Sequence, residues 1–204
     1  MTSTIDYYNK NAKAFSDNTR DVSFTDTQDR FMSLLLSGAS ILDFGCGSGR
    51  DTKYFLDKGF RVDAIDGSEE LCRMASDYTG IPVKHMYFEE FCEYNKYDGI
   101  WACASILHLE PSKLSVVMGR LERAVRPGGI IYASFKYGTY EGIRNDRYFT
   151  DFTEETFTGF LDDLRQKDIC PETDIIDMWT TKDVRPGRSE EIWLNLILQR
   201  LDRC

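Results

Sequence analysis

The stretch Ser40-Ile-Leu-Asp-Phe-Gly-Cys-Gly-Ser-Gly49 decides the fold of this chain. Its first five residues are a short apolar run, which is typical of a buried strand. Glycines follow at alternate positions 45, 47 and 49, more than an ordinary strand-to-helix turn needs, and they leave backbone N–H groups open to a ligand. Helical spacing resumes at Tyr54 and Phe55 and ends at Gly59. The stretch therefore predicts a strand, a ligand-binding turn and a helix.

Strands and helices alternate along most of the chain. Predicted strands cover residues 40–44, 60–66, 82–87, 97–103, 129–135, 174–181 and 191–199. Helical spacing is found at residues 5–15, 31–35 and 54–55, between Ser68 and Gly80, from Pro111 to Val125, and from Thr153 to Leu164. This alternation implies parallel crossover units in a doubly wound α/β sheet, whereas the last two strands imply an antiparallel edge hairpin.

The composition is that of one globular domain. The chain has 204 residues, 42% of them apolar, and shows no linker-like stretch or internal repeat. We expect a single domain over residues 1–204, with residues 1–38 as a helical lid region. The start resembles no secretory signal, and no run approaches the ~20 apolar residues that span a bilayer. These features predict a cytoplasmic protein without a membrane partner.

Charge and cysteine spacing exclude some partners. The net charge is −9, and a nucleic-acid backbone would need clustered Lys and Arg, so nucleic acid is an improbable main partner. The six cysteines form no CxxC pair and have no histidine cluster nearby. We therefore expect buried thiols and no metal. The oligomeric state is left open.

Two carboxylates suggest which nucleotide the glycine turn binds. The turn reads G-x-G-x-G, whereas dinucleotide-binding proteins carry G-x-G-x-x-G, and this spacing disfavours an NAD-linked oxidoreductase. Asp43 precedes the turn, where it would attract a cation and repel a phosphate. Asp66 ends the next strand and could accept hydrogen bonds from both ribose hydroxyls, although Asp66-Gly-Ser68 taken alone reads as a surface turn. The combination favours an adenosyl sulfonium.

Four ordered segments resemble the motifs of class I S-adenosylmethionine-dependent methyltransferases: Asp43-Phe-Gly-Cys-Gly-Ser-Gly49, Asp66, Tyr97-Asp-Gly-Ile100 and Arg126-Pro-Gly-Gly129. The resemblance spans residues 7–135, and the Cys-Gly-Ser-Gly-Arg-Asp segment at 46–51 is similar to small-molecule methyltransferases of the tellurite-resistance type. It implies a Rossmann-like, seven-stranded, mostly parallel sheet with an antiparallel C-terminal strand. The implied cofactor is S-adenosyl-L-methionine, with S-adenosyl-L-homocysteine as product and no metal.

Carried over residue by residue, the resemblance implies a cofactor site. Its members are Tyr7, Asp43, Gly45, Cys46, Gly47, Asp66, Gly67, Phe88, Trp101 and Ala102. The two loop glycines would pass close to the methionine part, Asp43 would orient its amino group, and Asp66 would hold the ribose. Trp101 and Ala102 would line the pocket beside the methionine tail.

The adenine end departs from the family pattern. Tyr87 stands where the family usually has an acidic residue that contacts adenine. Adenine would then pack on Phe88, with Glu89 or Glu90 as a substitute acid. At the N-terminus, Tyr7 would act as a lid residue, while the helical spacing of Tyr8 with Ala12 favours a core position.

The acceptor side has weaker signals. His108 is the candidate catalytic base, and a capping or packing role is equally open. The candidate acceptor contacts are Lys136, Arg185, Arg188 and Trp193. Two arginines could clamp an anionic acceptor, or could simply be solvated in a hairpin turn.

The sequence therefore predicts methyl transfer to a small-molecule acceptor. The alternatives are a non-catalytic nucleotide-binding sensor and a protein or nucleic-acid methyltransferase. Ala102-Cys-Ala-Ser105 lacks the Asn/Asp-Pro-Pro-aromatic segment of enzymes that methylate base amino groups.

Overall fold

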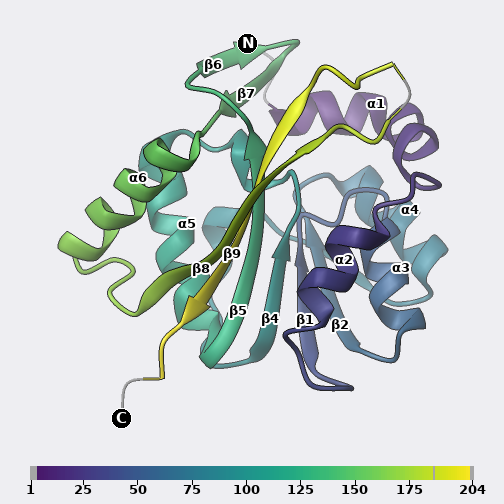
Figure 1. The fold of residues 1–204 in the computed structure, drawn as a ribbon. Coiled ribbons are helices and arrows are strands. Elements are labelled where there is room, and N and C mark those ends of the chain that lie inside the picture. Colours follow the sequence, from purple (N-terminus) through teal and green to yellow (C-terminus); the bar gives the residue numbers. More distant parts are fainter. Residues whose placement is uncertain (1–3, 186, 203–204) are drawn as a thin grey trace.

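The computed structural model describes residues 4–185 and 187–202. Its centre is a seven-stranded sheet in the order β3-β2-β1-β4-β5-β9-β8 (Figure 1). These strands are β1 (Ser40–Phe44), β2 (Arg61–Asp66), β3 (Val83–His85), β4 (Tyr97–Ala102), β5 (Val125–Lys136), β8 (Thr173–Lys182) and β9 (Ile192–Arg200). The first five pair in parallel, and β9 runs antiparallel to both β5 and β8. The predicted Rossmann-like sheet with an antiparallel C-terminal strand is confirmed.

Helices cover both faces of the sheet (Figure 1). They are α1 (Thr4–Thr19), α2 (Thr25–Met32), α3 (Arg50–Asp57), α4 (Glu69–Thr79), α5 (Pro111–Ala124) and α6 (Glu154–Gln166), with single 3-10 turns η1 (Phe88–Glu90) and η2 (Ile106–His108). Successive strand residues point to opposite faces. In β1, for example, Leu42 packs in the cluster that contains Leu114 of α5 and Phe157 of α6, while Ile41 packs in the cluster that contains Phe31 of α2 and Phe55 of α3.

Helix caps match the sequence expectations. Ser68 accepts a hydrogen bond from the Leu71 amide at the start of α4, and Gly80 ends that helix in the left-handed conformation. Thr153 caps α6 in the same way by accepting from Thr156 N. None of the helices built by the described residues is both long and apolar enough to cross a membrane.

Most element boundaries agree with the predictions to within one or two residues, and those of α2 and β5 differ by more. Helix α2 ends at Met32, and Leu34 beyond it is 49% exposed, so Leu34 does not extend the buried face of Phe31. Strand β5 begins at Val125, not Gly129, because Val125 pairs with Tyr97 before the register shifts. The Arg126-Pro-Gly-Gly129 motif thus lies in an irregular strand start.

A small second sheet was not predicted. Strands β6 (Glu141–Arg144) and β7 (Arg147–Thr150) form an antiparallel hairpin closed by Asn145 and Asp146. Both turn residues have positive φ, 49° and 60°, which a two-residue hairpin turn requires and which Asn and Asp tolerate. The hairpin stands beyond the carboxyl ends of the parallel strands, next to α1 (Figure 1).

Candidate cofactor and acceptor site

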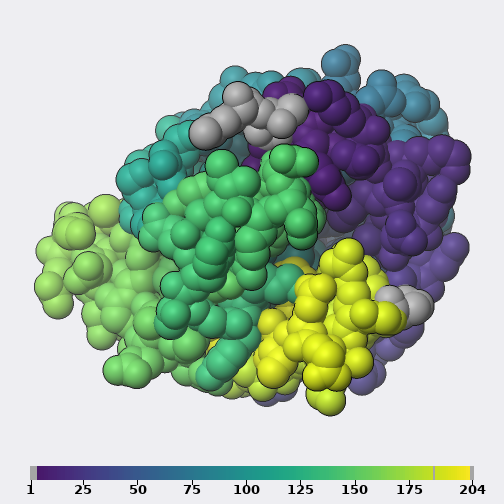
Figure 2. Space-filling view, turned by 90° about the horizontal axis from the view of Figure 1, so that it is seen from above, coloured from purple at the N-terminus to yellow at the C-terminus, as the bar shows by residue number. Residues whose placement is uncertain are grey.

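A cavity of about 890 Å³ lies beyond the carboxyl ends of β1, β2, β4 and β5. This is the edge where open α/β sheets bind ligands. Figure 2 looks down on this edge, with the β6–β7 hairpin in green, the β8–β9 connection in yellow and the N-terminal helices in purple around it. Residues of the hairpin, of the β8–β9 connection and of α1 line the cavity. The fold thus joins distant parts of the chain at one site.

The glycine turn after β1 forms the floor of this cavity. Gly45 has a φ of +87°, and a Cβ there would lie 2.4 Å from the Cβ of Ser105. Gly47 has a φ of +54°, and its Cβ would lie 3.0 Å from the ring of Phe15. Both positions need glycine, because of backbone conformation and because of close neighbours. The two glycines and Cys46 line the cavity, and their contact with a cofactor stays a prediction.

Asp66 connects the glycine turn to the end of β2. Its Oδ2 accepts a hydrogen bond from Gly47 N at 2.9 Å, and its Oδ1 accepts one from Ser68 N at 2.8 Å. Burial raises the pKa of Asp66, and the two backbone N–H groups oppose that rise. A carboxylate has about four acceptor positions, so two are left after these bonds. Asp66 and Gly67 both line the cavity.

Asp43 is buried under the turn and is not among the residues that line the cavity. Its Oδ2 accepts a hydrogen bond from Thr52 Oγ1 at 2.5 Å. Burial, together with the charge of Asp51, raises the pKa of Asp43 to about 8. The expectation that Asp43 meets the cofactor's amino group as a charged residue is therefore not met. The cavity-lining carboxylates near the turn are Asp51 and Asp66.

Asp51, which was not predicted as a site residue, also lines the cavity. Its carboxylate accepts hydrogen bonds from Gln28 Nε2 at 2.7 Å and from Trp101 Nε1 at 2.9 Å. Arg50 binds both of its oxygens, at 2.7 and 3.0 Å. Although burial opposes ionisation, Arg50 and these donors hold the pKa of Asp51 below its ordinary value. The adjacent Arg50-Asp51 pair in the sequence was a usable signal.

Trp101 and Ala102 do not line the cavity, contrary to the prediction. Both are fully buried in β4, and the Trp101 ring stacks on Tyr132 with centroids 3.9 Å apart. The residues after β4 take the predicted place, because Cys103 and Ala104 line the cavity. The predicted end of β4 is correct to within one residue. The error concerns which residues extend past the sheet into the cavity.

Residues of the predicted adenine end line the cavity. Phe88 lines the cavity, and its ring stacks on Phe44 with centroids 4.4 Å apart. Glu89 and Glu90 also line it, but Glu90 Oε2 accepts a hydrogen bond from Tyr87 N at 3.0 Å. Glu89 is 3.6 Å from Lys113 Nζ.

Tyr8, not Tyr7, lines the cavity. The Tyr8 hydroxyl lies 2.9 Å from Nε2 of His108, and Nδ1 of His108 lies 2.7 Å from the carbonyl oxygen of Tyr148. A carbonyl only accepts, so Nδ1 carries the proton and Nε2 accepts from Tyr8. Burial lowers the pKa of His108 to about 4, which keeps the ring neutral. Tyr7 instead lies beneath the guanidinium of Arg147, 4.5 Å from Cζ to the ring centroid.

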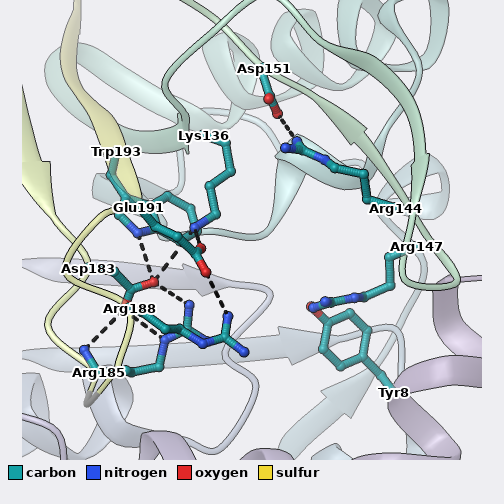
Figure 3. A network of polar contacts seen from close by, with 10 residues as sticks. All are labelled: Tyr8, Lys136, Arg144, Arg147, Asp151, Asp183, Arg185, Arg188, Glu191 and Trp193. Atoms are coloured by element: carbon teal, nitrogen blue, oxygen red, sulfur yellow. Dashed lines mark hydrogen bonds and ion pairs between the residues drawn. The ribbon is translucent and has the colours of Figure 1, made fainter.

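The predicted acceptor contacts Lys136, Arg185, Arg188 and Trp193 gather at one rim of the cavity (Figure 3). The side chain of Lys136 lies over the Trp193 ring, 3.8 Å from Nζ to the centroid. Lys136 is ion-paired to Glu191 and lies 3.6 Å from Asp183 Oδ2. Burial lowers the pKa of Lys136, while the two carboxylates oppose that shift.

Both rim arginines already have carboxylate partners. Arg185 binds Asp183 through Nε at 2.9 Å and Nη2 at 2.5 Å, and this pairing holds the pKa of Asp183 far below its usual range. Arg188 Nη1 lies 3.5 Å from Glu191 Oε1. The predicted two-arginine clamp is thus neutralised from within the protein. Sequence reasoning missed the partners because Asp183 and Glu191 carry no distinctive spacing.

Comparisons with known proteins find similar methyltransferases. Residues 41–129 match the sequence model of a methyltransferase domain. The malonyl-[acyl-carrier protein] O-methyltransferase of Salmonella typhimurium is 33% identical over 108 residues, which cover 48% of this chain and 40% of that protein. The N-terminal Xaa-Pro-Lys N-methyltransferase 1-A of Xenopus laevis is 38% identical over 101 residues, 46% of this chain and 45% of that one. The chain thus spans less than half the length of these curated relatives.

The likeness in fold to a solved methyltransferase covers nearly the whole chain. The crystal structure of the Burkholderia thailandensis 1,6-didemethyltoxoflavin-N1-methyltransferase, which holds 1,6-didemethyltoxoflavin and S-adenosylhomocysteine, superposes with a TM-score of 0.74 at 20% identity. It covers 97% of this chain and 85% of that one. Residues 41–129 thus match a methyltransferase domain, and the chain has the Rossmann-like fold of the solved methyltransferase.

Proposed function

We propose that this protein transfers a methyl group from S-adenosylmethionine to a small-molecule acceptor. The observation that carries the proposal is the Asp66 carboxylate, which lines the cavity and is fixed there by Gly47 N and Ser68 N. A fixed carboxylate can accept hydrogen bonds from both hydroxyls of a ribose. The glycine turn beside it lets the rest of the cofactor lie close to the protein backbone. The resemblance of residues 46–51 to tellurite-resistance-type enzymes supports a small acceptor. We also propose that the protein is a single domain and is cytoplasmic.

The residues around the turn fit the cofactor's parts. Asp66 has two acceptor positions left for the ribose hydroxyls, and Phe88 offers a ring for the base. Gly45 and Gly47 give the methionine part a backbone surface without side chains. Arg50 and Asp51 line the cavity as a neutral pair, so they add polarity there without a net charge.

The chemistry needs positioning more than proton transfer. When bound, the cofactor supplies a methyl group on a sulfonium whose leaving group is a neutral thioether. The cavity walls would hold the acceptor in line with that methyl group. An acceptor O–H or N–H could donate to the Tyr8 oxygen, whose own proton points to Nε2 of His108. His108 would then act through Tyr8, not by direct contact.

Calorimetry with S-adenosylhomocysteine tests the cofactor site. We expect binding to the protein, no binding of NADH, and an affinity loss of about tenfold or more in Asp66→Ala, since two charged hydrogen bonds to the ribose are removed. The matched control is Asp63→Ala, an exposed aspartate in the same strand that bonds to Tyr97 instead. Equal affinity in Asp66→Ala and Asp63→Ala would refute the ribose assignment.

The acceptor class is tested with methyl-labelled cofactor. We expect label to enter small molecules of a metabolite extract. Label that enters only peptides beginning Xaa-Pro-Lys, or only nucleic acid, would overturn the small-molecule assignment. Cofactor binding without any transfer would instead point to a sensor.

A further inference from the structure

Arg147 differs from the other arginines of the cavity wall in its ion pairing. Five arginines of the described chain line the cavity: Arg50, Arg144, Arg147, Arg185 and Arg188. Four of them pair with carboxylates, namely Asp51, Asp151, Asp183 and Glu191. No carboxylate of the described residues lies within 4.0 Å of Arg147. Lys182 lines the cavity without an ion pair in the same residues, but it is exposed to water.

The surroundings of Arg147 are aromatic. Its Cζ lies 4.5 Å from the ring centroid of Tyr7, 5.3 Å from that of Phe149 and 5.8 Å from that of Tyr8. Its Nη1 is 3.4 Å from the Tyr8 hydroxyl, and its Nε is buried without a hydrogen-bond partner. Aromatic faces offset part of the cost of withdrawing a cation from water, but they leave its charge uncompensated. No carboxylate among the described residues therefore pairs with the charge of Arg147.

The β6–β7 hairpin holds Arg147 in a defined place. Phe149, two residues on, is buried and packs on the His108 ring with centroids 4.7 Å apart. The Tyr148 carbonyl accepts from His108, and the Tyr148 amide donates to Thr4 Oγ1 at 3.1 Å. In Figure 3 the guanidinium of Arg147 extends from the hairpin to the Tyr8 hydroxyl, and no dashed contact joins it to the Lys136–Asp183–Glu191 rim. Arg147 therefore marks a wall of the cavity that is separate from the paired rim.

We propose that Arg147 binds a carboxylate of the methyl acceptor, and that the acceptor carries this group on an aromatic or otherwise apolar body. A carboxylate matches the planar guanidinium and supplies the missing charge. Tyr8 and Phe149, which line the cavity beside Arg147, would contact the apolar body. The inference rests on the proposed function, because a methyl acceptor presupposes methyl transfer. The positive charge of Arg147 also opposes the binding of a cationic peptide at this wall.

Benzoate and its neutral isostere benzamide are the probes. They are titrated into the protein saturated with S-adenosylhomocysteine, and binding is followed by ligand-observed NMR. We expect benzoate to bind about tenfold or more tightly than benzamide, and Arg147→Gln to remove that difference, since the charged pair is lost. Arg147→Lys should restore part of it. Arg123→Gln, which removes the same charge from an exposed position in α5, is the matched control.

Each other outcome overturns the inference. Equal binding of benzoate and benzamide, or unchanged benzoate binding in Arg147→Gln, removes the carboxylate site. Loss of benzoate binding in Arg188→Gln but not in Arg147→Gln moves the anion to the opposite rim. Binding of inorganic phosphate in place of benzoate excludes the carboxylate class. The affinity for S-adenosylhomocysteine, measured on the same variants, tests the cofactor site separately. A benzoate titration without S-adenosylhomocysteine tests Arg147 even if the proposed cofactor site is wrong.

Discussion

Two buried aspartates below the glycine turn differ in charge because one of them has an arginine. Arg50 binds both oxygens of Asp51, whereas Asp43 has only the Thr52 hydroxyl as a side-chain donor. Two neighbouring buried carboxylates do not ionise together readily, so the pair keeps its charge on Asp51. Asp43 retains its proton in the folded protein, since its pKa is raised to about 8.

This difference predicts opposite outcomes for two isosteric substitutions. Asp43→Asn keeps a neutral group in the folded state and removes the cost of protonating a carboxylate that is ionised in the unfolded chain at pH 7, so it should leave the free energy of unfolding unchanged or raise it. Asp51→Asn leaves Arg50 mostly buried without its partner and should cost about 3–5 kcal/mol. Urea denaturation measures both. Equal losses in the two variants would contradict the assignment of charge.

The same pKa predicts a pH dependence. The folded chain holds the Asp43 proton up to about pH 8, while the unfolded chain releases it near the ordinary value of 3.8. The folded state binds more protons between these values, so this residue's contribution to stability falls as pH rises towards about 8. Urea midpoints from pH 6.5 to 9 should fall less in Asp43→Asn than in the unsubstituted protein. Parallel curves would refute a raised pKa.

These residues also show where sequence reasoning stops. The positions of Gly45, Gly47 and Asp66 followed from spacing, because a strand end and a turn fix where their backbone goes. The charge of Asp43 did not follow, because it depends on burial and on which carboxylate Arg50 binds. Trp101 was misplaced for a related reason, since alternate strand residues face opposite sides and only packing decides which residue reaches the cavity.

At the scale of elements, the cavity is closed by a link between three segments. The Tyr8 hydroxyl of α1 donates to His108 at the end of η2, and His108 donates to the Tyr148 carbonyl of β7. Ile5 of α1 also lies against Gly67, where an added Cβ would approach Ile5 Cδ1 to 2.7 Å. α1 is therefore attached to the cavity edge by apolar contact and by several polar bonds, among them Tyr8 to His108, Thr4 to Tyr148 and Thr19 to Ser48.

Tyr8→Phe tests this attachment. The change leaves Nε2 of His108 buried without a donor, at a cost of about 1–3 kcal/mol, which should loosen α1 before the sheet. Hydrogen exchange should become faster in α1 amides and stay unchanged in β1. Tyr7→Phe, which keeps the bond between Tyr8 and His108, is the matched control. Faster exchange in both variants alike would contradict a role for that bond.

The β6–β7 hairpin was the main element missed. Asn145-Asp146 between alternating residues was a turn signal, but the flanking strands are only four residues each and lack a continuous apolar face. Strands β1 to β5, by contrast, are buried between helices and carry apolar runs that pattern analysis detects. Because Arg147 lies on the missed hairpin, its part in the site could not be predicted either.

At the scale of the whole molecule, the strand order makes the C-terminal strand central. β9 lies between β5 and β8, and Ile130 pairs with Gln199 at one end of the contact and Lys136 with Trp193 at the other. Asn195 of β9 is fully buried, and its Oδ1 accepts a hydrogen bond from Tyr132 Oη at 2.7 Å. The sheet is thus completed only when a strand from the chain's end enters between two earlier ones.

This topology predicts that a chain ending at Lys182 does not fold. Without β9, the edge of β5 exposes unpaired N–H and C=O groups, β8 has no neighbour, and the apolar side chains Leu194, Leu196 and Leu198 leave the core. We expect aggregation or a non-cooperative thermal transition by circular dichroism, whereas a chain ending at Asp202 should melt cooperatively. A cooperative transition in the shorter chain, with binding of S-adenosylhomocysteine retained, would show that β1 to β5 fold and build the cofactor cavity without the inserted strand.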